Sequence, residues 1–563
     1  MGDVPVNLFN ANESSELVQR ATWSLVWLAI TTFGLDIWSQ WSSWPGDALL
    51  APALVGVGIL GLGWLWLRQE RSSLAGHFAM AASVLAVLAG QGANIAARNF
   101  YTTDSAAFND VATRLFLHGH NPYSSSMAPA DALLHPAANF WTYLLGGGHV
   151  TQVSYPAGSF IFQSALHSLG VHHLTTDWLD LGSWIIAAVA LYAFLDKPLR
   201  WIAPLLLLAN AYMWTFANGG TDALWVPFLV VAVWRWDRFA AFNSSGIERW
   251  ISPVALGVAC SIKQSPWFCL PFLLLGVALE ARAHQTGGLR TPLRYGLLTL
   301  GTFGLVNSPF IIWGPRAWLD GVLLPLRRPL VPDGQGLIAL ALHGFVRGVD
   351  LRLLWVAGLG ALGALLLAMI LWYPTMKRAW LFLLPLVLFI PGRSISNYLL
   401  NFFPAAILAG LSVTSVGAQA RVTMPAWVRR LLGTAPWIAT VLLATLALSR
   451  APLSITVGPV QTSNNYHVFT SIQLTVHNNT TQNATPHFMV ALGGSHPSGF
   501  WDATLSQGVF PLAPGASATV TITPTRWTWA PNRADYWLVD AFTSTPQTLS
   551  TSQLQRWPLG PLQ

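Results

Sequence analysis

Long apolar segments separated by short polar loops constrain this chain most. Its residues are 53% hydrophobic and only 9% charged, whereas about 25% of the residues in an ordinary soluble domain are charged. A helix that crosses a bilayer needs about 20 mostly apolar residues. We therefore predict a polytopic helical membrane protein with about thirteen membrane helices, which begin near Ala21, Asp47, Leu74, Asp177, Trp201, Thr221, Ile251, Pro266, Arg294, Leu351, Ala379, Ser396 and Thr434.

The basic residues predict which way the chain is inserted. Most arginines lie in short loops, and cytoplasmic loops collect basic residues, so the net charge of +7 needs no nucleic-acid partner. A cytoplasmic N-terminus places on that side Arg68 with Arg71, Lys197 with Arg200, Arg235 with Arg238 and Arg249, Arg282 with Arg290, Lys377 with Arg378, and Arg421 with Arg429 and Arg430. An odd number of helices then puts the C-terminus outside. We predict a multi-pass protein of the plasma membrane with an extracytoplasmic tail.

Five basic residues fall on the outer face against this rule: Lys263, Arg316, Arg327, Arg328 and Arg393. Any one of them is explained by a long side chain that reaches the lipid headgroups. A cation at bilayer depth is costly, however, and is commonly functional. The five together favour an anionic ligand on the outer side.

The composition changes near Pro452, which divides a membrane domain (1–450) from a tail domain (451–563). Beyond this point the chain has no lysine and many threonines, serines and asparagines. Its short alternating segments predict an antiparallel β-sandwich. The runs LTVHNN and LAPGASATVTITP resemble bacterial immunoglobulin-like modules. We interpret the tail tryptophans as core residues, with stacking on sugar rings as the alternative.

Two large outer loops are predicted, at 99–170 and 314–350. In the first, apolar residues recur with helical spacing at Phe108, Val111, Ala112, Leu115 and Phe116. This spacing predicts an amphipathic helix that lies on the bundle or on the membrane surface. Thr103 or Asp104 would cap its start, and Gly119 would end it. A capping role alone would explain Asp104.

Several short motifs, in a fixed order, resemble glycosyltransferase family 87. The first outer loop supplies Asp104, Phe108 where the family usually has tyrosine, Gly119, Asn121, Pro122, Tyr123, Tyr155 and Pro156. Later matches are NGGTDALW at 218–225, SIKQSPW at 261–267, NSPFIIWGPRAW at 307–318 and RSISNYLLNFFP at 393–404. The resemblance covers about residues 74–416. It implies a GT-C-fold enzyme that uses a polyprenyl-phosphate sugar.

The resemblance also implies roles for individual residues. Asp104 would be the general base that activates an acceptor hydroxyl in an inverting transfer. The outer cations would bind the donor phosphate, with Arg393 first, Lys263 second, and then Arg327, Arg328 and Arg316. The sugar or acceptor would be bound by Asp222, Asn218, His120, Asn121, Tyr123, Tyr155, Asn397 and Tyr398. Asp222 has a helix-capping role as its alternative.

Neither a metal nor a cofactor is expected, because the lipid-linked donor is itself the substrate. The first outer loop has no D-x-D or E-x-D motif. His118 and His120 flank Gly119 without a third ligand, so hydrogen bonding or an interfacial position explains them better than metal binding.

The predicted reaction is the transfer of a hexose or pentose, with mannose as the default, to a glycolipid or glycan acceptor among the membrane lipids. Two alternatives remain open. A flippase or transporter of lipids or lipid-linked sugars would also be polytopic, but it typically shows two similar halves with broken helices. A non-catalytic protein could capture a cell-surface polymer with its tail. Polar residues clustered in the outer loops favour the enzyme.

Overall fold

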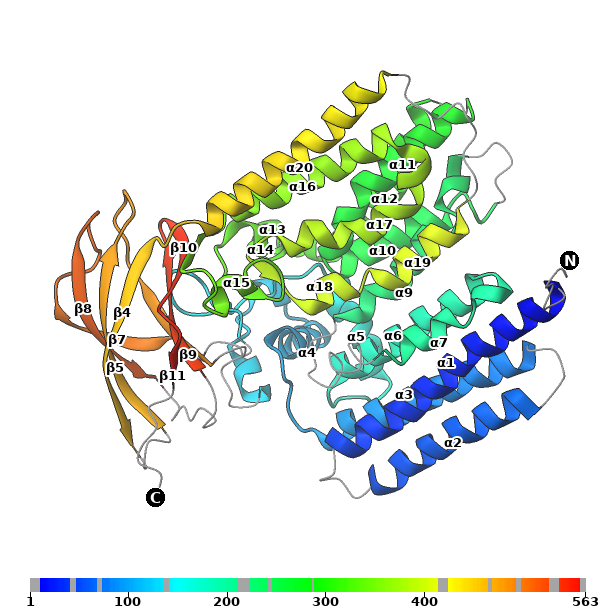
Figure 1. Ribbon diagram of the computed structural model, residues 1–563, viewed down its shortest axis with the longest axis horizontal. Coiled ribbons are helices and arrows are strands. Elements are labelled where there is room, and N and C mark those ends of the chain that lie inside the picture. The colour runs from blue at the N-terminus through cyan, green and yellow to red at the C-terminus, as the bar shows by residue number, and fades with distance from the viewer. Residues whose placement is uncertain are drawn as a thin grey trace, which may run out of the picture.

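The computed structural model describes residues 11–40, 47–67, 73–134, 141–209, 222–240, 246–285, 288–413, 424–463, 468–492, 498–525 and 536–556. The chain forms a large helical bundle followed by a curled β-sheet at one end (Figure 1). The bundle therefore precedes the sheet in the chain, as the change in composition predicts.

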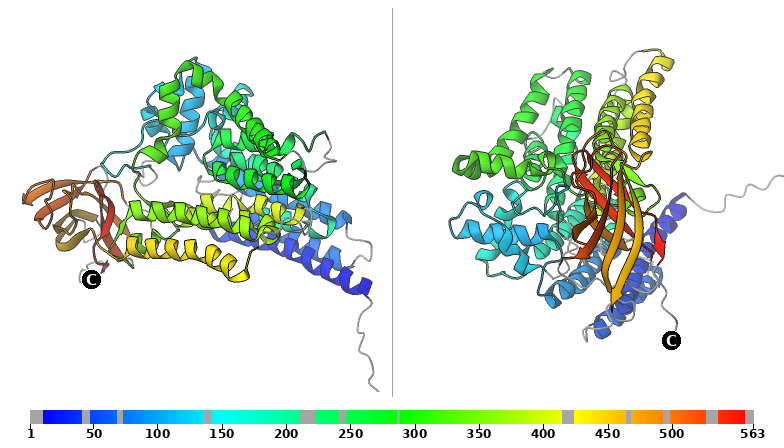
Figure 2. Two further views of the ribbon diagram at one scale, coloured as in Figure 1. Left: turned by 90° about the horizontal axis from the view of Figure 1, so that it is seen from above. Right: turned by 90° about the vertical axis from the view of Figure 1, so that its left-hand side faces the viewer.

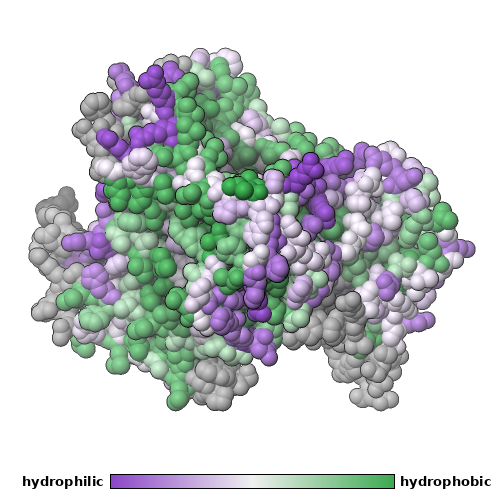
Figure 3. All heavy atoms as spheres, turned by 180° about the vertical axis from the view of Figure 1, so that it is seen from behind, coloured by the Kyte–Doolittle hydropathy of each residue, from purple (hydrophilic) through white to green (hydrophobic). Residues whose placement is uncertain are grey.

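Seven described helices are long and apolar enough to cross a membrane: Leu49–Leu67, Leu74–Ala97, Thr175–Phe194, Ser265–Ala283, Arg290–Trp313, Leu351–Leu371 and Ala426–Leu448. Two further apolar helices, Ala223–Val233 and Ile251–Ile262, are shorter. Much of the helical part seen in Figure 3 carries a hydrophobic surface. These features are those of a membrane protein, while the number of thirteen spans remains a prediction.

The first three helices form a layer along one side of the bundle (Figures 1 and 2). They are α1 (Ala11–Gln40), α2 (Asp47–Leu67) and α3 (Ser73–Ala97). Helices α1 and α2 approach closely because α2 has a glycine opposite a tryptophan of α1. A Cβ atom on Gly61 would lie 2.2 Å from the ring of Trp27. Small residues at such contacts let membrane helices pack backbone to backbone.

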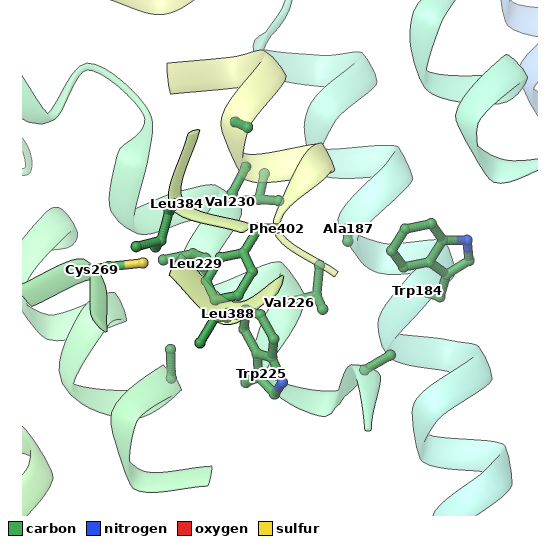
Figure 4. Packing of buried hydrophobic residues seen from close by; sticks show 14 of the residues in the cluster. Trp184, Ala187, Trp225, Val226, Leu229, Val230, Cys269, Leu384, Leu388 and Phe402 are labelled. Carbon is green, nitrogen blue, oxygen red and sulfur yellow. The ribbon is translucent and has the colours of Figure 1, made fainter. Parts of the chain in front are cut away.

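Ten helices among the described residues build the rest of the bundle. They are α6 (Thr175–Phe194), α7 (Ile202–Leu207), α9 (Val226–Val233), α10 (Ile251–Ile262), α11 (Leu270–Ala283), α12 (Arg290–Trp313), α16 (Leu351–Leu371), α17 (Tyr373–Phe389), α19 (Phe403–Ser412) and α20 (Ala426–Leu448). Their shared core is apolar. In Figure 4, Trp225 and Leu229 pack with Leu384 of α17 and with Phe402, which immediately precedes α19. This packing fixes the chain around residue 222, next to the site described below.

A buried ionic cluster ties α11 and α17 to the 3₁₀ turn η6 (Trp236–Ala240). Lys377 Nζ lies 3.0 Å from Asp237 Oδ2 and 2.8 Å from Glu280 Oε1. The hydroxyl of Tyr373 donates a 2.7 Å hydrogen bond to the same Glu280 oxygen. Buried charges are retained in proteins when they are paired and hydrogen-bonded in this way.

The segment predicted as the first outer loop folds against the bundle. It contains α4 (Asp104–Leu117), the 3₁₀ turns η1 (Pro122–Ser124) and η2 (Ala128–Leu133), and α5 (Gly158–Ser168). The predicted amphipathic helix is present as α4, and its face with Phe108, Val111 and Ala112 is buried in the protein core. Gly119 follows the helix with φ of +76°. The helix therefore packs on the bundle.

The segment predicted as the second outer loop contains α13 (Pro315–Val322), α14 (Leu324–Arg327), the short strand β1 (Asp333–Gly334), α15 (Ala339–Leu342) and β2 (Gly348–Asp350). Strand β1 pairs in parallel with β3 (Arg393–Ser394), which precedes α18 (Ser396–Leu400). Helix α15 has four residues and is therefore too short to cross a membrane.

The tail forms one curled antiparallel sheet, so the prediction of a two-sheet sandwich is wrong. Its strands are β4 (Leu453–Ser463), β5 (Val468–Asn478), β6 (His487–Leu492), β7 (Trp501–Gln507), β8 (Ser517–Pro524), β9 (Tyr536–Ser544), β10 (Gln547–Thr551) and β11 (Gln555–Arg556). The order is β2-β10-β9-β6-β7-β8-β5-β4, with β11 on β9. The curl brings the two ends together, and Leu453 N donates to Ser550 Oγ at 2.9 Å.

Two tail tryptophans, Trp501 and Trp537, are buried inside the curl, in agreement with their interpretation as core residues. The others, Trp527, Trp529 and Trp557, lie outside the described residues. The edge strand β2 comes from the membrane domain and pairs antiparallel with β10. The sheet is therefore completed by a segment that lies about two hundred residues earlier in the chain.

Candidate functional site

Five side chains from distant parts of the sequence meet at one point, here called the central cluster: Tyr155, Asp222, Lys263, Asn397 and Tyr398. Lys263 Nζ forms an ion pair with Asp222 Oδ2. The same ammonium lies 4.9 Å from the ring centre of Tyr155 and 5.2 Å from that of Tyr398. Asn397 Nδ2 donates to Asp222 Oδ2 at 2.9 Å. Cation–π contacts and charge-assisted hydrogen bonds stabilise such an arrangement.

The cluster forms where helices begin or end. Lys263 directly follows α10 in extended backbone, and Asp222 precedes the turn η5 (Ala223–Trp225) with φ of 45°. Tyr155 precedes α5, and Asn397 lies in the short helix α18. Helix ends inside a membrane bundle supply polar backbone and side-chain groups to buried sites. This explains why charged residues occur between apolar segments here.

Asp180 holds the start of η5, and the sequence interpretation missed it. Its Oδ1 accepts hydrogen bonds from Ala223 N at 2.8 Å and from Leu224 N at 3.0 Å. The side chain of Asp222 makes no capping bond there, so the alternative of a capping role for Asp222 is wrong. The signal that could have identified Asp180 is its position as an acidic residue within an apolar helix.

Asp104 is the first residue of α4, and its carboxylate is buried. Its Oδ2 accepts a hydrogen bond of 2.6 Å from the backbone N–H of Thr142. Burial raises the pKa of this carboxyl, while the hydrogen bond from Thr142 and the positive charge of Arg393 oppose the rise. Asp104 therefore does more than begin a helix, because it joins α4 to a segment 38 residues later.

The positive charge of Arg393 acts on both Asp104 and Tyr155 of the central cluster. Its charge lowers the pKa of Asp104 and that of Tyr155. Its guanidinium donates to Val331 O at 3.3 Å, and strand β3 fixes its backbone against β1. Gly334 makes this pairing possible, because it has φ of +116° and a Cβ atom there would lie 2.3 Å from the Ser394 carbonyl.

The Tyr155 hydroxyl remains protonated at the site. Burial raises its pKa well above the usual range, and the negative charge of Asp222 is the next largest cause. Tyr398 and Asp104 raise it further. Because Asp104 and Asp222 both act on Tyr155, this residue connects the aspartate of the loop to the central cluster.

The Asn-Pro-Tyr motif (residues 121–123) supports the backbone of the central cluster. Asn121 Oδ1 accepts from Tyr123 N at 3.0 Å, and the Tyr123 hydroxyl donates to Tyr155 O at 2.7 Å. The ring of Tyr123 packs edge-on against Phe160 and Phe310. Tyr123 therefore holds the backbone of Tyr155, and Asn121 holds the backbone of Tyr123. Binding of sugar or acceptor by these two residues stays a prediction.

Several predicted ligands are not brought to the central cluster. His120, Arg316, Arg327 and Arg328 are exposed on the outer loops, and Arg327 pairs with Asp320 at 2.6 Å. The positive charge of Lys263 is compensated by Asp222. Asn218 lies outside the described residues. Among the predicted cations, Arg393 is the one whose charge lowers the pKa of Asp104.

A small cavity of about 20 Å³ adjoins the cluster. It is lined by Asn109, Tyr155, Ser159, Gln163, Thr176, Leu179, Asp180, Asp222, Leu224, Trp225, Ile262 and Lys263. Its wall joins the loop helices α4 and α5 to α6, η5 and α10. The cavity therefore belongs to the same junction as the cluster.

No group of three or more His, Cys, Asp or Glu side chains that could hold a metal occurs within the described part of the chain. A buried carboxylate with a raised pKa, an arginine and a set of hydrogen-bonding groups is suited to proton abstraction beside an anion.

Neither the known protein families nor the curated proteins include a match to this chain.

Proposed function

We propose that this protein is an integral-membrane inverting glycosyltransferase. It would move a sugar, with mannose as the default, from a polyprenyl-phosphate donor to a glycolipid or glycan acceptor on the outer face. The proposal rests on the resemblance of the loop motifs to glycosyltransferase family 87 and on the way these motifs converge. The observation that carries it is the electrostatic proximity of three of these residues, because the charge of Arg393 acts on both Asp104 and Tyr155 and the charge of Asp104 acts on Tyr155.

In the proposed reaction, Asp104 is the general base. The acceptor hydroxyl oxygen attacks the anomeric carbon as its proton passes to the Asp104 carboxylate. The bond from the anomeric carbon to the phosphate oxygen breaks on the opposite side, so the configuration inverts and polyprenyl phosphate leaves. Burial supports this role, because it raises the pKa of Asp104 and makes its carboxylate a stronger base.

The leaving phosphate gains negative charge, and fixed cations at such a position contribute strongly to catalysis. We assign this task to Arg393, whose backbone is held by the β1–β3 pair. Lys263 has a different role in this proposal. Its ion pair orients Asp222, whose carboxylate also accepts from Asn397, and these two polar groups would bind sugar hydroxyls.

The test is transfer by the purified full-length protein. Labelled polyprenyl-phosphate mannose and a membrane lipid extract are supplied, and labelled product is separated from donor. We expect Asp104→Asn to lower the rate by about 10²-fold or more while the protein remains folded and inserted. Asp131→Asn changes an exposed carboxylate of the same loop and is expected to keep the wild-type rate. Equal rates for wild type and Asp104→Asn would contradict the role of Asp104.

A flippase for lipid-linked sugars is the second candidate, and a specific feature favours it. The ion pair of Lys263 and Asp222 lies where α10 ends and the segment before α9 turns, and transporters bind substrates at such discontinuous helices. Reconstitution in vesicles with labelled donor separates the two candidates. Movement of intact donor between leaflets without any transfer would replace the enzyme by the flippase.

A further inference from the structure

Three residues that line the small cavity beside the central cluster each have a buried polar side-chain atom without a hydrogen-bond partner. These atoms are Asn109 Oδ1, Ser159 Oγ and Trp225 Nε1. Their residues are only 7%, 4% and 1% exposed. Unpaired buried polar atoms are rare and cost about 1–3 kcal/mol each. The cavity is thus built to receive a polar group.

The unpaired atoms also define what that group must offer. Asn109 Oδ1 is an acceptor, Trp225 Nε1 is a donor, and Ser159 Oγ is both. In Figure 4 the indole nitrogen of Trp225 points away from the hydrophobic cluster. Their neighbours are already occupied, since Gln163 Nε2 donates to Thr176 Oγ1 at 2.7 Å. A hydroxyl group, which donates and accepts, matches this set.

Size and charge narrow the occupant further. The cavity measures about 20 Å³, and a single water needs about 10–15 Å³ on this scale. A group of about two heavy atoms fits, whereas a sugar ring does not. The lining has one cation, which pairs with Asp222, and a second carboxylate, Asp180, which accepts two backbone N–H groups, so no unpaired cation is left there for an anionic ligand. These features indicate a neutral occupant.

We infer that the cavity takes the hydroxymethyl group of the transferred hexose, while the ring lies beside Tyr155 at the central cluster. This inference rests on the proposed glycosyltransferase function and deepens it, because it names the substrate class. A carbon with one hydroxyl has the size, the neutrality and the hydrogen-bonding character that the lining requires. The protein would then discriminate hexoses from pentoses at this cavity.

The experiment measures equilibrium binding and transfer for three donors with the purified full-length protein. They are polyprenyl-phosphate mannose, its 6-deoxy analogue, and the pentose analogue without the C6 hydroxymethyl group. We expect the wild type to bind the hexose donor most tightly and the other two about 10-fold or more weakly, since a site with buried hydrogen-bonding groups rejects analogues that leave those groups unpaired. Equal affinity for all three donors would overturn the inference alone.

Two variants test the lining directly. Ser159→Ala and Trp225→Phe are each expected to weaken binding of the hexose donor by about 3- to 10-fold, the usual effect of one neutral hydrogen bond, and to leave the 6-deoxy donor unchanged. Ser83→Ala is the matched control, because Ser83 is a buried serine of α3 whose hydroxyl donates to Ala79 O. Equal losses for all donors would show that the cavity holds only water. Failure of all three donors to bind the wild type would overturn the proposed function as well.

Discussion

The ammonium of Lys263 and the carboxylate of Asp222 form a buried ion pair between the end of α10 and the start of η5. The two side chains are 5% and 17% exposed, so little water shields either charge. They are 41 positions apart in the sequence, so no local sequence pattern predicts their contact. The pair fixes the centre of the site.

Removing one member of this pair should destabilise the protein strongly. Lys263→Met leaves the Asp222 carboxylate buried without its cation, which typically costs about 3–5 kcal/mol. The double variant Lys263→Met with Asp222→Leu should recover much of that loss, because no unpaired charge remains. Thermal unfolding of wild type, both single variants and the double variant in detergent measures the coupling. Additive single effects would show that the two charges do not depend on each other.

The pH dependence of transfer should report the raised pKa of Asp104. In the proposed reaction the carboxylate is active when deprotonated, so the rate should fall as the pH falls through a midpoint above the ordinary aspartate value of about 3.9. The charge of Arg393 lowers this pKa. Arg393→Gln should therefore move the acid limb to higher pH, in addition to lowering the maximum rate. A pH–rate profile of both proteins provides the measurement, and an unmoved limb would separate Arg393 from Asp104.

The hydroxyl of Tyr123 should matter through Tyr155. Tyr123→Phe removes the 2.7 Å hydrogen bond to Tyr155 O and keeps the aromatic packing on Phe160 and Phe310. We expect a loss of about 0.5–1.5 kcal/mol in the free energy of unfolding and a reduced transfer rate. Tyr536→Phe, at an exposed position of β9, is the control. Unfolding curves and initial rates that match wild type would remove the supporting role of Tyr123.

Asp540 should make the sheet less stable as the pH rises above the ordinary range of an aspartate. It is fully buried on β9, both carboxyl oxygens lack a hydrogen-bond partner, and burial raises its pKa well above the usual value. Its neutral form is the one that suits the fold. The stability contribution is therefore complete below the unfolded-state pKa of about 3.9 and is lost as the pH rises through the raised folded-state pKa.

Asp540→Leu should remove this pH dependence, because an apolar side chain of similar size has no charge to bury. Thermal unfolding of the full-length protein over a pH series measures the effect. Asp502→Asn, an exposed carboxylate on β7, should follow the wild-type curve. A wild type whose stability is independent of pH would contradict the burial of a titrating Asp540.

Local patterns predicted the parts of the fold that depend on local physics. The recurrence of Phe108, Val111 and Ala112 predicted α4, because burial of one helix face leaves a period in the sequence. Alternation likewise predicted most tail strands. The single curled sheet was not predictable in this way, since β2 joins it from residues 348–350 and its pairing with β10 is non-local.

The residues of the candidate site also fall into two groups, those with a signal in the local sequence and those that depend on non-local packing. Asp104, Lys263 and Arg393 stood out because charged residues among apolar segments are conspicuous. The support by Asp180 and the polar cavity around Asn109 and Ser159 depend on how α4, α5 and α6 pack. Buried serines and asparagines have no distinctive spacing, so their common cavity appears only once the chain is folded.

The two strands at the ends of the strand order, β2 and β4, both connect the sheet to the bundle. Strand β2 runs directly into α16, α20 leads into β4, and α16 and α20 lie side by side (Figure 2). An ordinary flexible tether would let an outer domain sample many orientations. Here two helices packed side by side connect the sheet to the bundle, so the sheet can turn relative to the bundle far less than a domain on a single tether would.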